Sequence, residues 1–345
     1  VQLPLDYVDV RLKEINTQED YDEAIMWYEN GCRGFYWPVR ISVALSLHFG
    51  PSYGLLLTLV EVVGIERKRL NMTAYMDHKN LANEVIDGVR AVQIADGVHR
   101  VLDRIASAEQ HAGRDAGSVR LLAATKTRDV GEIMAAIDAG VRMIGENRPQ
   151  EVMAKAEGLM ARCGERGFAL GVADDAGAST IAGEHIPFHL IGQLQSNKIG
   201  KVLPVVNTIE SVDSLDLAEK ISRRAVARGI TVGVLLEVNE SGEASKSGCD
   251  PSHAIRIAQK IGTLDGLELQ GLMTIGAHVD DETAIRKGFE HLRKTRDHIL
   301  ESGEPGTQSC RELSMGMTGD MELAVAEGST IVRVGTAIFG ERAFI

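Results

Sequence analysis

Eight short apolar runs alternate with helical segments between residues 119 and 335, and this alternation restricts the fold more than any other feature. The runs are Val119–Lys126, Met143–Asn147, Phe188–Gly192, Val205–Ser211, Val232–Asn239, Leu267–Ile275, Glu312–Gly316 and Thr330–Gly335. Helical periodicity covers residues 79–112, 130–139, 215–228, 251–261, 283–300 and 321–326. Eight strands with intervening helices over about 220 residues predict an α/β fold, a (β/α)8 TIM barrel. The alternative is a doubly wound sheet, which usually has a glycine-rich turn after its first strand, and none follows Lys126.

Residues 1–75 differ in composition from the rest of the chain, because all six tyrosines and both tryptophans lie there. We therefore expect an atypical N-terminal extension of uncertain structure over residues 1–75 and the barrel over residues 76–345. The extension is a small added domain, a partner-binding segment, or upstream sequence translated from a misplaced start. Its apolar stretch 41–65 is broken by Gly50-Pro51 and Glu61, which argues against a membrane span. Cys163–His185 is rich in Gly, Ala and Asp, and we expect an exposed loop or insertion there.

Charge and cysteine content argue against several classes of protein. A net charge of −12 disfavours a nucleic-acid binder, which usually presents a basic face, but leaves room for a small anionic ligand in a local pocket. The four cysteines lie far apart and form no CxxC pair, so we expect reduced thiols and no metal site. The sequence shows no secretory signal peptide. These features predict a cytoplasmic protein with no nucleic-acid or membrane partner.

Polar side chains gather at the ends of the predicted strands. Lys126 ends the first run, and Glu146 and Asn147 end the second. Later positions are His189, Gln195, Asn197, Lys198, Asn239, Glu243, Lys246, His278, Ser314, Met315, Gly316, Met317, Thr318, Arg333, Gly335 and Thr336. Because the strands of a TIM barrel open at one mouth, we expect many of these side chains to meet there.

The loops after the seventh and eighth strands have the composition of a phosphate site. TIM barrels commonly bind phosphate in these two loops through backbone N–H groups at a helix N-terminus. Gly316, Gly319 and Gly335 would let the backbone approach a phosphate closely. Ser314 and Thr336 would add hydroxyl donors.

A lysine on one side of the mouth and a phosphate site on the other are the two anchors that pyridoxal 5′-phosphate requires. Its aldehyde condenses with the lysine amine as a Schiff base, and its phosphate is bound across the ring. Arg333 lies between the two anchors in the predicted mouth and would face the pyridine nitrogen. Because arginine cannot accept a proton, it would leave that nitrogen unprotonated and weaken the cofactor as an electron sink.

Seven motifs in the same order resemble those of the pyridoxal phosphate homeostasis protein family, relatives of the N-terminal barrel of alanine racemase. They are Leu121-Leu-Ala-Ala-Thr-Lys126, Gly145-Glu-Asn147, His189-Leu-Ile-Gly-Gln-Leu-Gln-Ser-Asn-Lys198, Glu237-Val-Asn239 with Lys246-Ser-Gly248, Gly271-Leu-Met-Thr274, Leu313-Ser-Met-Gly-Met317, and Val332-Arg-Val-Gly-Thr-Ala-Ile-Phe-Gly340. The resemblance covers about residues 78–342 and implies fold type III of pyridoxal phosphate proteins. It implies that the cofactor is bound to Lys126 and surrounded by Asn147, Ser314, Met317, Arg333, Gly335 and Thr336. The departures are residues 1–75, the loop 163–185, and Thr318 where the family often has serine.

The resemblance also implies a role in pyridoxal phosphate homeostasis, as a carrier without substantial turnover. A racemase needs an acid/base group on each face of the substrate, and in alanine racemases the second group is a tyrosine from another domain. The barrel region has no tyrosine, and we expect no such domain after it and therefore a monomer. Lys198 and Lys246 would help to pass the cofactor to apo-enzymes, or they are ordinary surface charges.

Two further hypotheses remain from the sequence. The first is a weak amino-acid racemase in which His189 or His278 replaces the missing tyrosine. The second is a Schiff-base aldolase that uses Lys126 on a phosphorylated sugar without a cofactor. An aldolase needs a neighbouring group to tune the lysine, and Glu146 is the near candidate.

Overall fold

The computed structural model describes residues 88–172, 184–243, 247–277, 279 and 281–341. The chain divides into two compact units, Val1–Glu84 and Val85–Ile345, and the described residues all belong to the second. The expected extension over residues 1–75 and its boundary at residue 76 lie outside the described residues, so that division stays a prediction. The apolar stretch 41–65 lies outside them as well.

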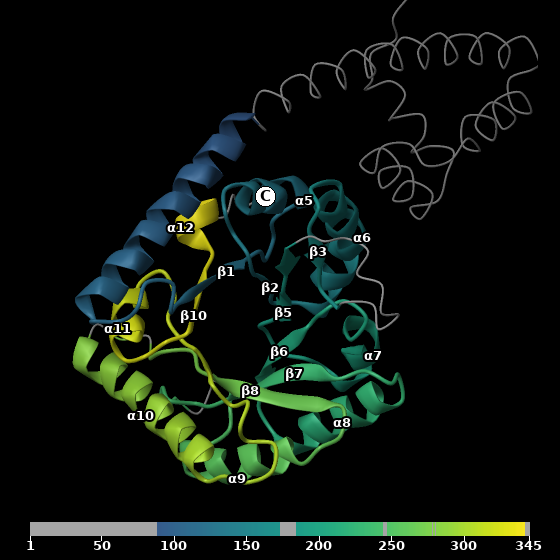
Figure 1. The fold of residues 1–345 in the computed structure, drawn as a ribbon, viewed down its shortest axis with the longest axis vertical. Coiled ribbons are helices and arrows are strands. Elements are labelled where there is room, and N and C mark those ends of the chain that lie inside the picture. The colour runs from purple at the N-terminus through teal and green to yellow at the C-terminus, as the bar shows by residue number, and fades with distance from the viewer. Residues whose placement is uncertain (1–87, 173–183, 244–246, 278, 280, 342–345) are drawn as a thin grey trace, which may run out of the picture. The chain divides into compact units, whose positions relative to one another are not determined.

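A closed barrel of eight parallel strands forms the centre of the second unit (Figure 1). The strands are β1 (Arg120–Ala124), β2 (Ile144–Glu146), β5 (Phe188–Leu190), β6 (Thr208–Val212), β7 (Val232–Glu237), β8 (Leu267–Met273), β9 (Glu312–Ser314) and β10 (Ile331–Val334). Around the barrel they follow the order β1-β10-β9-β8-β7-β6-β5-β2, and β2 closes the ring on β1. The predicted barrel is therefore confirmed, and each strand falls on one of the eight apolar runs.

Helices surround this ring (Figure 1). They are a helix over residues 88–111, α5 (Val130–Asp138), α6 (Pro149–Glu165), α7 (Ile199–Val202), α8 (Leu215–Val226), α9 (Pro251–Gly262), α10 (Glu282–Glu301), α11 (Met321–Ala326) and α12 (Thr336–Phe339), with a 3-10 turn η1 (Ser196–Lys198). Local chemistry sets their ends. Asp129 and Glu132 form a capping box that begins α5, and Gly140, at φ 113°, follows its end. The helices predicted from periodicity are confirmed to within two residues at each described end.

The segment Cys163–His185 differs from the predicted exposed loop. Helix α6 continues through Glu165, and Cys163 is fully buried. Beyond the helix, β3 (Ala169–Leu170) pairs in parallel with β4 (His185–Ile186), while residues 173–183 lie outside the described residues. The loop prediction was therefore wrong at both ends. At the first end, Cys163 shares a buried face of α6 with Val152, Ala156 and Leu159. At the second end, residues 185–186 pair with a strand on the far side of the segment, which no local pattern indicates.

The apolar core has two parts. The larger part packs the outer faces of the strands against the helices. A smaller cluster of Leu122, Met143, Ile191 and Ile331 fills the inside of the barrel. Gly145 lies close beside it, since a Cβ there would lie 2.6 Å from Cδ2 of Leu122. These side chains pack against one another within the ring, as is usual for a barrel of eight strands.

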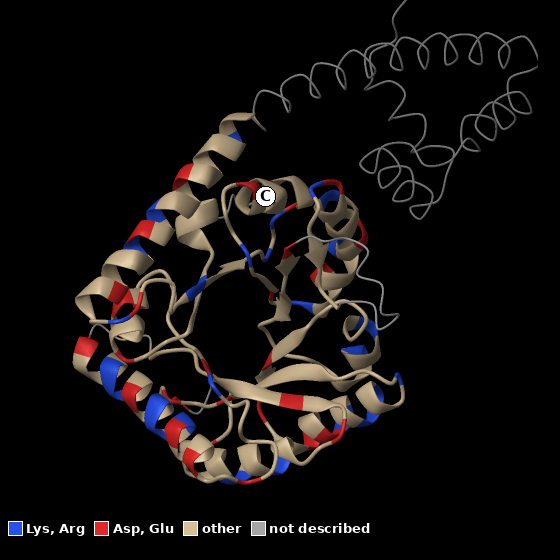
Figure 2. Ribbon diagram, in the orientation of Figure 1, with Lys and Arg blue, Asp and Glu red and all other residues tan. Residues whose placement is uncertain are grey.

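Charged residues lie mainly on the outer helices, as the alternating signs along α10 show (Figure 2). Within the described residues, no helix combines the length and the apolar character that crossing a bilayer requires. Cys163, Cys249 and Cys310 are free thiols, and all three are buried. Burial raises the pKa of the Cys249 thiol and of the Cys310 thiol to about 12.

Candidate functional site

Four of the residues that the sequence placed at strand ends follow adjacent strands of the barrel. Lys126 follows β1, is exposed, and interacts with other residues of the protein. Asn147 follows β2, and Gly335 and Thr336 follow β10 and begin α12. Strand β1 lies between β2 and β10. The mouth positions of these residues therefore come from three adjacent strands.

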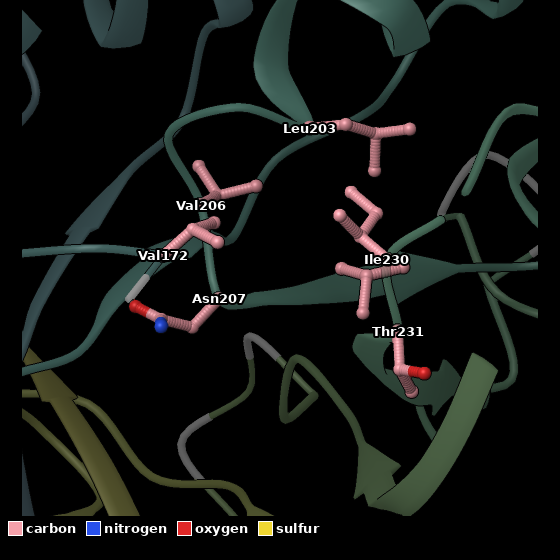
Figure 3. Close-up of a pocket in the computed structure, with 7 residues that line it drawn as sticks. Val172, Leu203, Val206, Asn207, Ile230 and Thr231 are labelled. Carbon is pink, nitrogen blue, oxygen red and sulfur yellow. The ribbon is translucent and has the colours of Figure 1, made fainter. Parts of the chain in front are cut away.

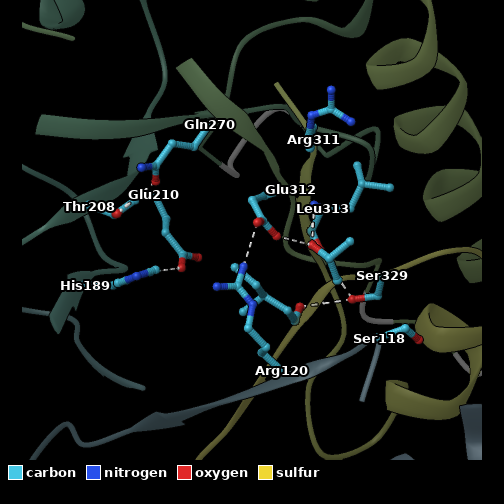
Figure 4. Close-up of polar contacts among 12 residues, drawn as sticks. Ser118, Arg120, His189, Thr208, Glu210, Gln270, Arg311, Glu312, Leu313 and Ser329 are labelled. Atoms are coloured by element: carbon cyan, nitrogen blue, oxygen red, sulfur yellow. Dashed lines mark hydrogen bonds and ion pairs between the residues drawn. The ribbon is translucent and has the colours of Figure 1, made fainter. Parts of the chain in front are cut away.

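A continuous chain of buried polar groups crosses the barrel beneath the mouth. His189 Nδ1 lies 2.7 Å from Glu210 Oε1, and Figure 4 shows these two side chains pointing toward one another. Ser314 Oγ donates to Glu210 Oε2 at 2.6 Å. Arg333 donates one hydrogen bond to Ser314 Oγ at 2.7 Å and another to the backbone carbonyl of Thr274 at 2.8 Å. We call these five residues the Glu210 network.

Opposite charges stabilise this buried network. Burial by itself would raise the pKa of Glu210, but the hydrogen bond and charge of His189, together with the charge of Arg333, lower it below its usual value. Burial lowers the pKa of Arg333, and the Glu210 carboxylate 4.0 Å away opposes that change. Arginine stays charged even so. The guanidinium is thus fixed in place at the mouth by Ser314, Thr274 and Glu210.

Glu237 is a second buried carboxyl group near Arg333. It ends β7, which is four strands around the ring from β1 and so lies across the barrel from Lys126. Its exposed fraction is 3%. Burial and the charge of Asp213 raise its pKa to about 7, although Arg333 acts in the opposite direction. Near neutral pH this carboxyl group therefore exists in both protonation states.

The loop after β10 has the geometry expected for anion binding, whereas the loop after β9 has a backbone N–H that is already bonded. Gly335 is the N-cap residue of α12, and Thr336 is exposed at the first position of that helix. The first N–H groups of a helix have no partner within it, so they are available to an anion. The backbone at position 316 also favours glycine, because its φ is 96° and a Cβ there would lie 2.5 Å from Ala324 Cβ. The N–H of Met317 already donates to Asp320 Oδ1 at 2.6 Å.

Two buried acceptor atoms at the strand next to β1 have no hydrogen-bond partner among the residues that the structure describes. They are Asn147 Oδ1 and Glu146 Oε2, both at the end of β2. Buried polar atoms are nearly always satisfied. Asn147 Oδ1 therefore fits a bound molecule that brings a hydrogen-bond donor to the mouth.

The other oxygen of Glu146 is bound inside the protein. Glu146 Oε1 accepts from Thr125 Oγ1 at 2.7 Å and from Lys155 Nζ at 2.6 Å. Burial raises the pKa of Glu146, and Lys155 and Thr125 oppose the change. Glu146, the group considered for tuning the lysine of an aldolase, is thus engaged with Thr125 and Lys155.

The remaining predicted positions differ in where they lie. Lys246 and His278 lie outside the described residues, so their predicted roles stay predictions. Lys198 lies in η1 on the segment after β5. His189 is 4% exposed and belongs to the Glu210 network.

Sequence reasoning missed Glu210 and Lys155, and it gave no role to Glu237 or Thr274. A signal was present for the two glutamates, because each is the lone charged residue of its strand. Charged residues are almost never buried unless they are paired, so such positions merit a functional hypothesis. Lys155 gave no comparable signal, since a lysine on an amphipathic helix is ordinary.

Two surface pockets lie away from the mouth. The first, of about 170 Å³, lies at the amino ends of β6 and β7, where Val206, Asn207, Ile230 and Thr231 line it (Figure 3). The second, of about 400 Å³, lies between the helix over residues 88–111, α10 and α11. Neither is lined by a strand-end residue of the candidate site.

Comparison with known proteins first defines the class and then the family. The barrel and its mouth are of the alanine racemase type, and the family model described as "Alanine racemase, N-terminal domain" matches residues 99–343. A protein of Vibrio cholerae named pyridoxal phosphate homeostasis protein is 37% identical over 254 residues, which cover 72% of this chain and 96% of that protein. The chain belongs to the pyridoxal phosphate homeostasis protein family, and the resemblance seen in the sequence is confirmed.

Solved structures agree with this assignment. A crystal structure of a protein from Bifidobacterium adolescentis is 85% identical, with a TM-score of 0.70, and covers 73% of this chain and 96% of its own. The structure of PipY from Synechococcus elongatus with pyridoxal phosphate bound is 31% identical, with a TM-score of 0.54. That match covers 68% of this chain and all of PipY.

Proposed function

We propose that this chain binds pyridoxal 5′-phosphate reversibly through Lys126 and takes part in the homeostasis of that cofactor. The observation that carries the proposal is a charged arginine held in a buried network at the mouth of a barrel whose first strand is followed by a lysine. A relative of known structure, PipY, has pyridoxal phosphate bound. When bound, this cofactor supplies an aldehyde that captures amines and a ring that withdraws electrons.

Each predicted residue has a chemical role in this proposal. The neutral amine of Lys126 adds to the aldehyde carbon, a C=N bond replaces the C=O bond, and the oxygen leaves as water with the two amine protons. The N–H groups at Gly335 and Thr336 bind the phosphate, and Asn147 Oδ1 accepts a hydrogen bond from the cofactor. Ser314 holds Arg333, and Met317 borders the mouth with 36% of its surface exposed.

Arg333 favours carriage of the cofactor over catalysis. Its guanidinium stays charged and has no acceptor atom, so it cannot accept a hydrogen bond from a protonated pyridine nitrogen, and the nitrogen that faces it stays unprotonated. A racemase also needs a second acid/base group, and His189 is bound to Glu210 inside the barrel. These two features support a weak electron sink and argue against efficient racemisation.

The proposal extends to partners and setting. Reversible binding of a reactive aldehyde suits a protein that buffers pyridoxal phosphate and passes it to apo-enzymes. The buried free thiols of Cys163, Cys249 and Cys310 are consistent with the cytoplasm. We propose a monomer, because the site is assembled from strands of one barrel.

Absorption spectra test the proposal directly. The purified protein should show a visible imine band that borohydride removes, and Lys126→Ala should lack it. Lys198→Ala is the matched control, because it removes a lysine that follows β5 and should keep the band. A protein that stays colourless with added pyridoxal phosphate would refute the cofactor proposal and favour the aldolase hypothesis.

A further inference from the structure

The backbone on both sides of Lys126 is held by one cluster of charged side chains. Lys155 extends from α6 toward the end of β1, and its side chain is 12% exposed. Its ammonium group donates to Glu146 Oε1 at 2.6 Å, to Glu151 Oε2 at 3.0 Å and to the backbone carbonyl of Thr125 at 3.1 Å. An ammonium has three donors, so these three bonds satisfy all of them. We call Glu146, Glu151 and Lys155 the ion triad.

The triad reaches the residue before Lys126 in two ways. Lys155 binds the carbonyl of Thr125, and Glu146 accepts from the Thr125 hydroxyl at 2.7 Å. Thr125 is fully buried, and its N–H donates to the carbonyl of Gly145 at 2.9 Å. Thr125 is therefore fixed through its side chain and its backbone.

The triad also holds the residue after Lys126. Glu151 Oε2 accepts from the N–H of Thr127 at 2.7 Å. Thr127 has a φ of 64°, the left-handed region, and it is the non-glycine residue with positive φ among the described residues. For a β-branched residue this conformation is unfavourable and persists only where the surroundings impose it. The charged bond from Glu151 is such a restraint.

We propose that the ion triad is a positioning device that fixes the Lys126 backbone for covalent capture of an aldehyde. Lys155 acts through Thr125 and Thr127 and does not touch the cofactor. With the backbone fixed beforehand, forming the C=N bond orders less of the chain. The inference rests on the proposed function, since it assumes that Lys126 forms that bond.

Two ligands that differ only at the reacting group separate positioning from general stability. Pyridoxal phosphate has the aldehyde, whereas pyridoxamine phosphate has the same ring and phosphate but cannot form a C=N bond with a lysine. In the full chain, Lys155→Met should weaken binding of pyridoxal phosphate about 10- to 100-fold, the effect of a misplaced reacting group. Binding of pyridoxamine phosphate should stay within about twofold. Calorimetric titration measures both.

Matched variants complete the test. Arg166→Met removes the ion pair with Asp138 at the C-terminal end of α6, away from the triad. It should leave the affinities for pyridoxal phosphate and pyridoxamine phosphate unchanged. If Lys155→Met does not fold, Glu151→Ala removes the bond to Thr127 from a side chain that is 19% exposed. It should reproduce the selective loss, and Glu151→Gln, which keeps an acceptor oxygen, should restore most of the affinity.

The outcomes are distinct. Equal losses of affinity for both ligands would show that the triad only stabilises the structure. No loss of affinity for either ligand would show that the triad has no role in binding. Each of these results refutes the inference while the wild-type imine band still supports the proposed function. If the wild-type protein itself forms no band, the proposed function fails, and the inference fails with it.

Discussion

Replacing Glu237 by glutamine should stabilise the protein at neutral and alkaline pH. The carboxyl group of Glu237 is buried at the end of β7, and its pKa is raised from 4.5 to about 7, first by burial and then by Asp213. An acid with a raised pKa in the folded state binds its proton more tightly there than in the unfolded chain. Its favourable contribution is complete below pH 4.5 and is lost as the pH rises toward about 7.

The size of the effect follows from the same pKa. A change from 4.5 to about 7 corresponds to about 3 kcal/mol of unfolding free energy once the group is fully ionised. Glu237→Gln removes this cost because the amide never ionises. Between pH 5.5 and pH 8, the stability gained by the variant over the wild type should grow by about 2 kcal/mol.

Urea unfolding of the cofactor-free protein at several pH values measures this gain, without the stabilisation that a bound ligand adds. Glu157→Gln is the matched control, since it removes the same charge from an exposed position on α6. A gain that does not change with pH, or one equal to that of the control, would refute the reasoning. It would mean that Glu237 titrates normally and that its burial is relieved by solvent.

Two further variants test the packing around the mouth. Glu210→Gln leaves the buried Arg333 without its carboxylate and should cost about 3–5 kcal/mol of unfolding free energy at pH 7. Because the pKa of Glu210 is lowered in the folded state, this loss should shrink as the pH falls below the pKa of an ordinary carboxyl group. A loss that stays unchanged in acid would contradict this assignment. Gly192→Ala places a Cβ 2.2 Å from the carbonyl oxygen of Asn147, so it should lower the melting temperature and weaken binding of pyridoxal phosphate and pyridoxamine phosphate alike. An alanine variant with wild-type melting temperature and affinities would show that the backbone at Asn147 adjusts freely.

The sequence predicted the barrel well because the signal for each element is local. The period of apolar residues distinguishes strands from helices within a few residues, and caps such as Asp129 mark where a helix begins. It failed over Cys163–His185, where a Gly-rich composition hid the buried face of α6 and the β3–β4 pair. There the burial of Cys163 depends on what the helix packs against, which no local pattern records.

The candidate site divides in the same way. Lys126, Ser314 and Arg333 are identifiable from the sequence, because parallel strands present their carboxyl ends at one mouth whatever the details of the barrel. The sequence shows where the two acids Glu210 and Glu237 lie along their strands, but it does not show which groups they contact.

Only the tertiary structure decided which side chains meet. Closure and register of the strands place Glu210 of β6 against Ser314 of β9, and the packing of α6 brings Lys155 to the end of β1. Contacts between distant strands depend on how the ring closes, and this closure results from packing interactions over the whole barrel rather than from any local pattern of residues. The sequence by itself therefore determined the barrel and the place of Lys126 after its first strand, whereas the tertiary structure determined the charged network that fixes Arg333 and the triad beside Lys126.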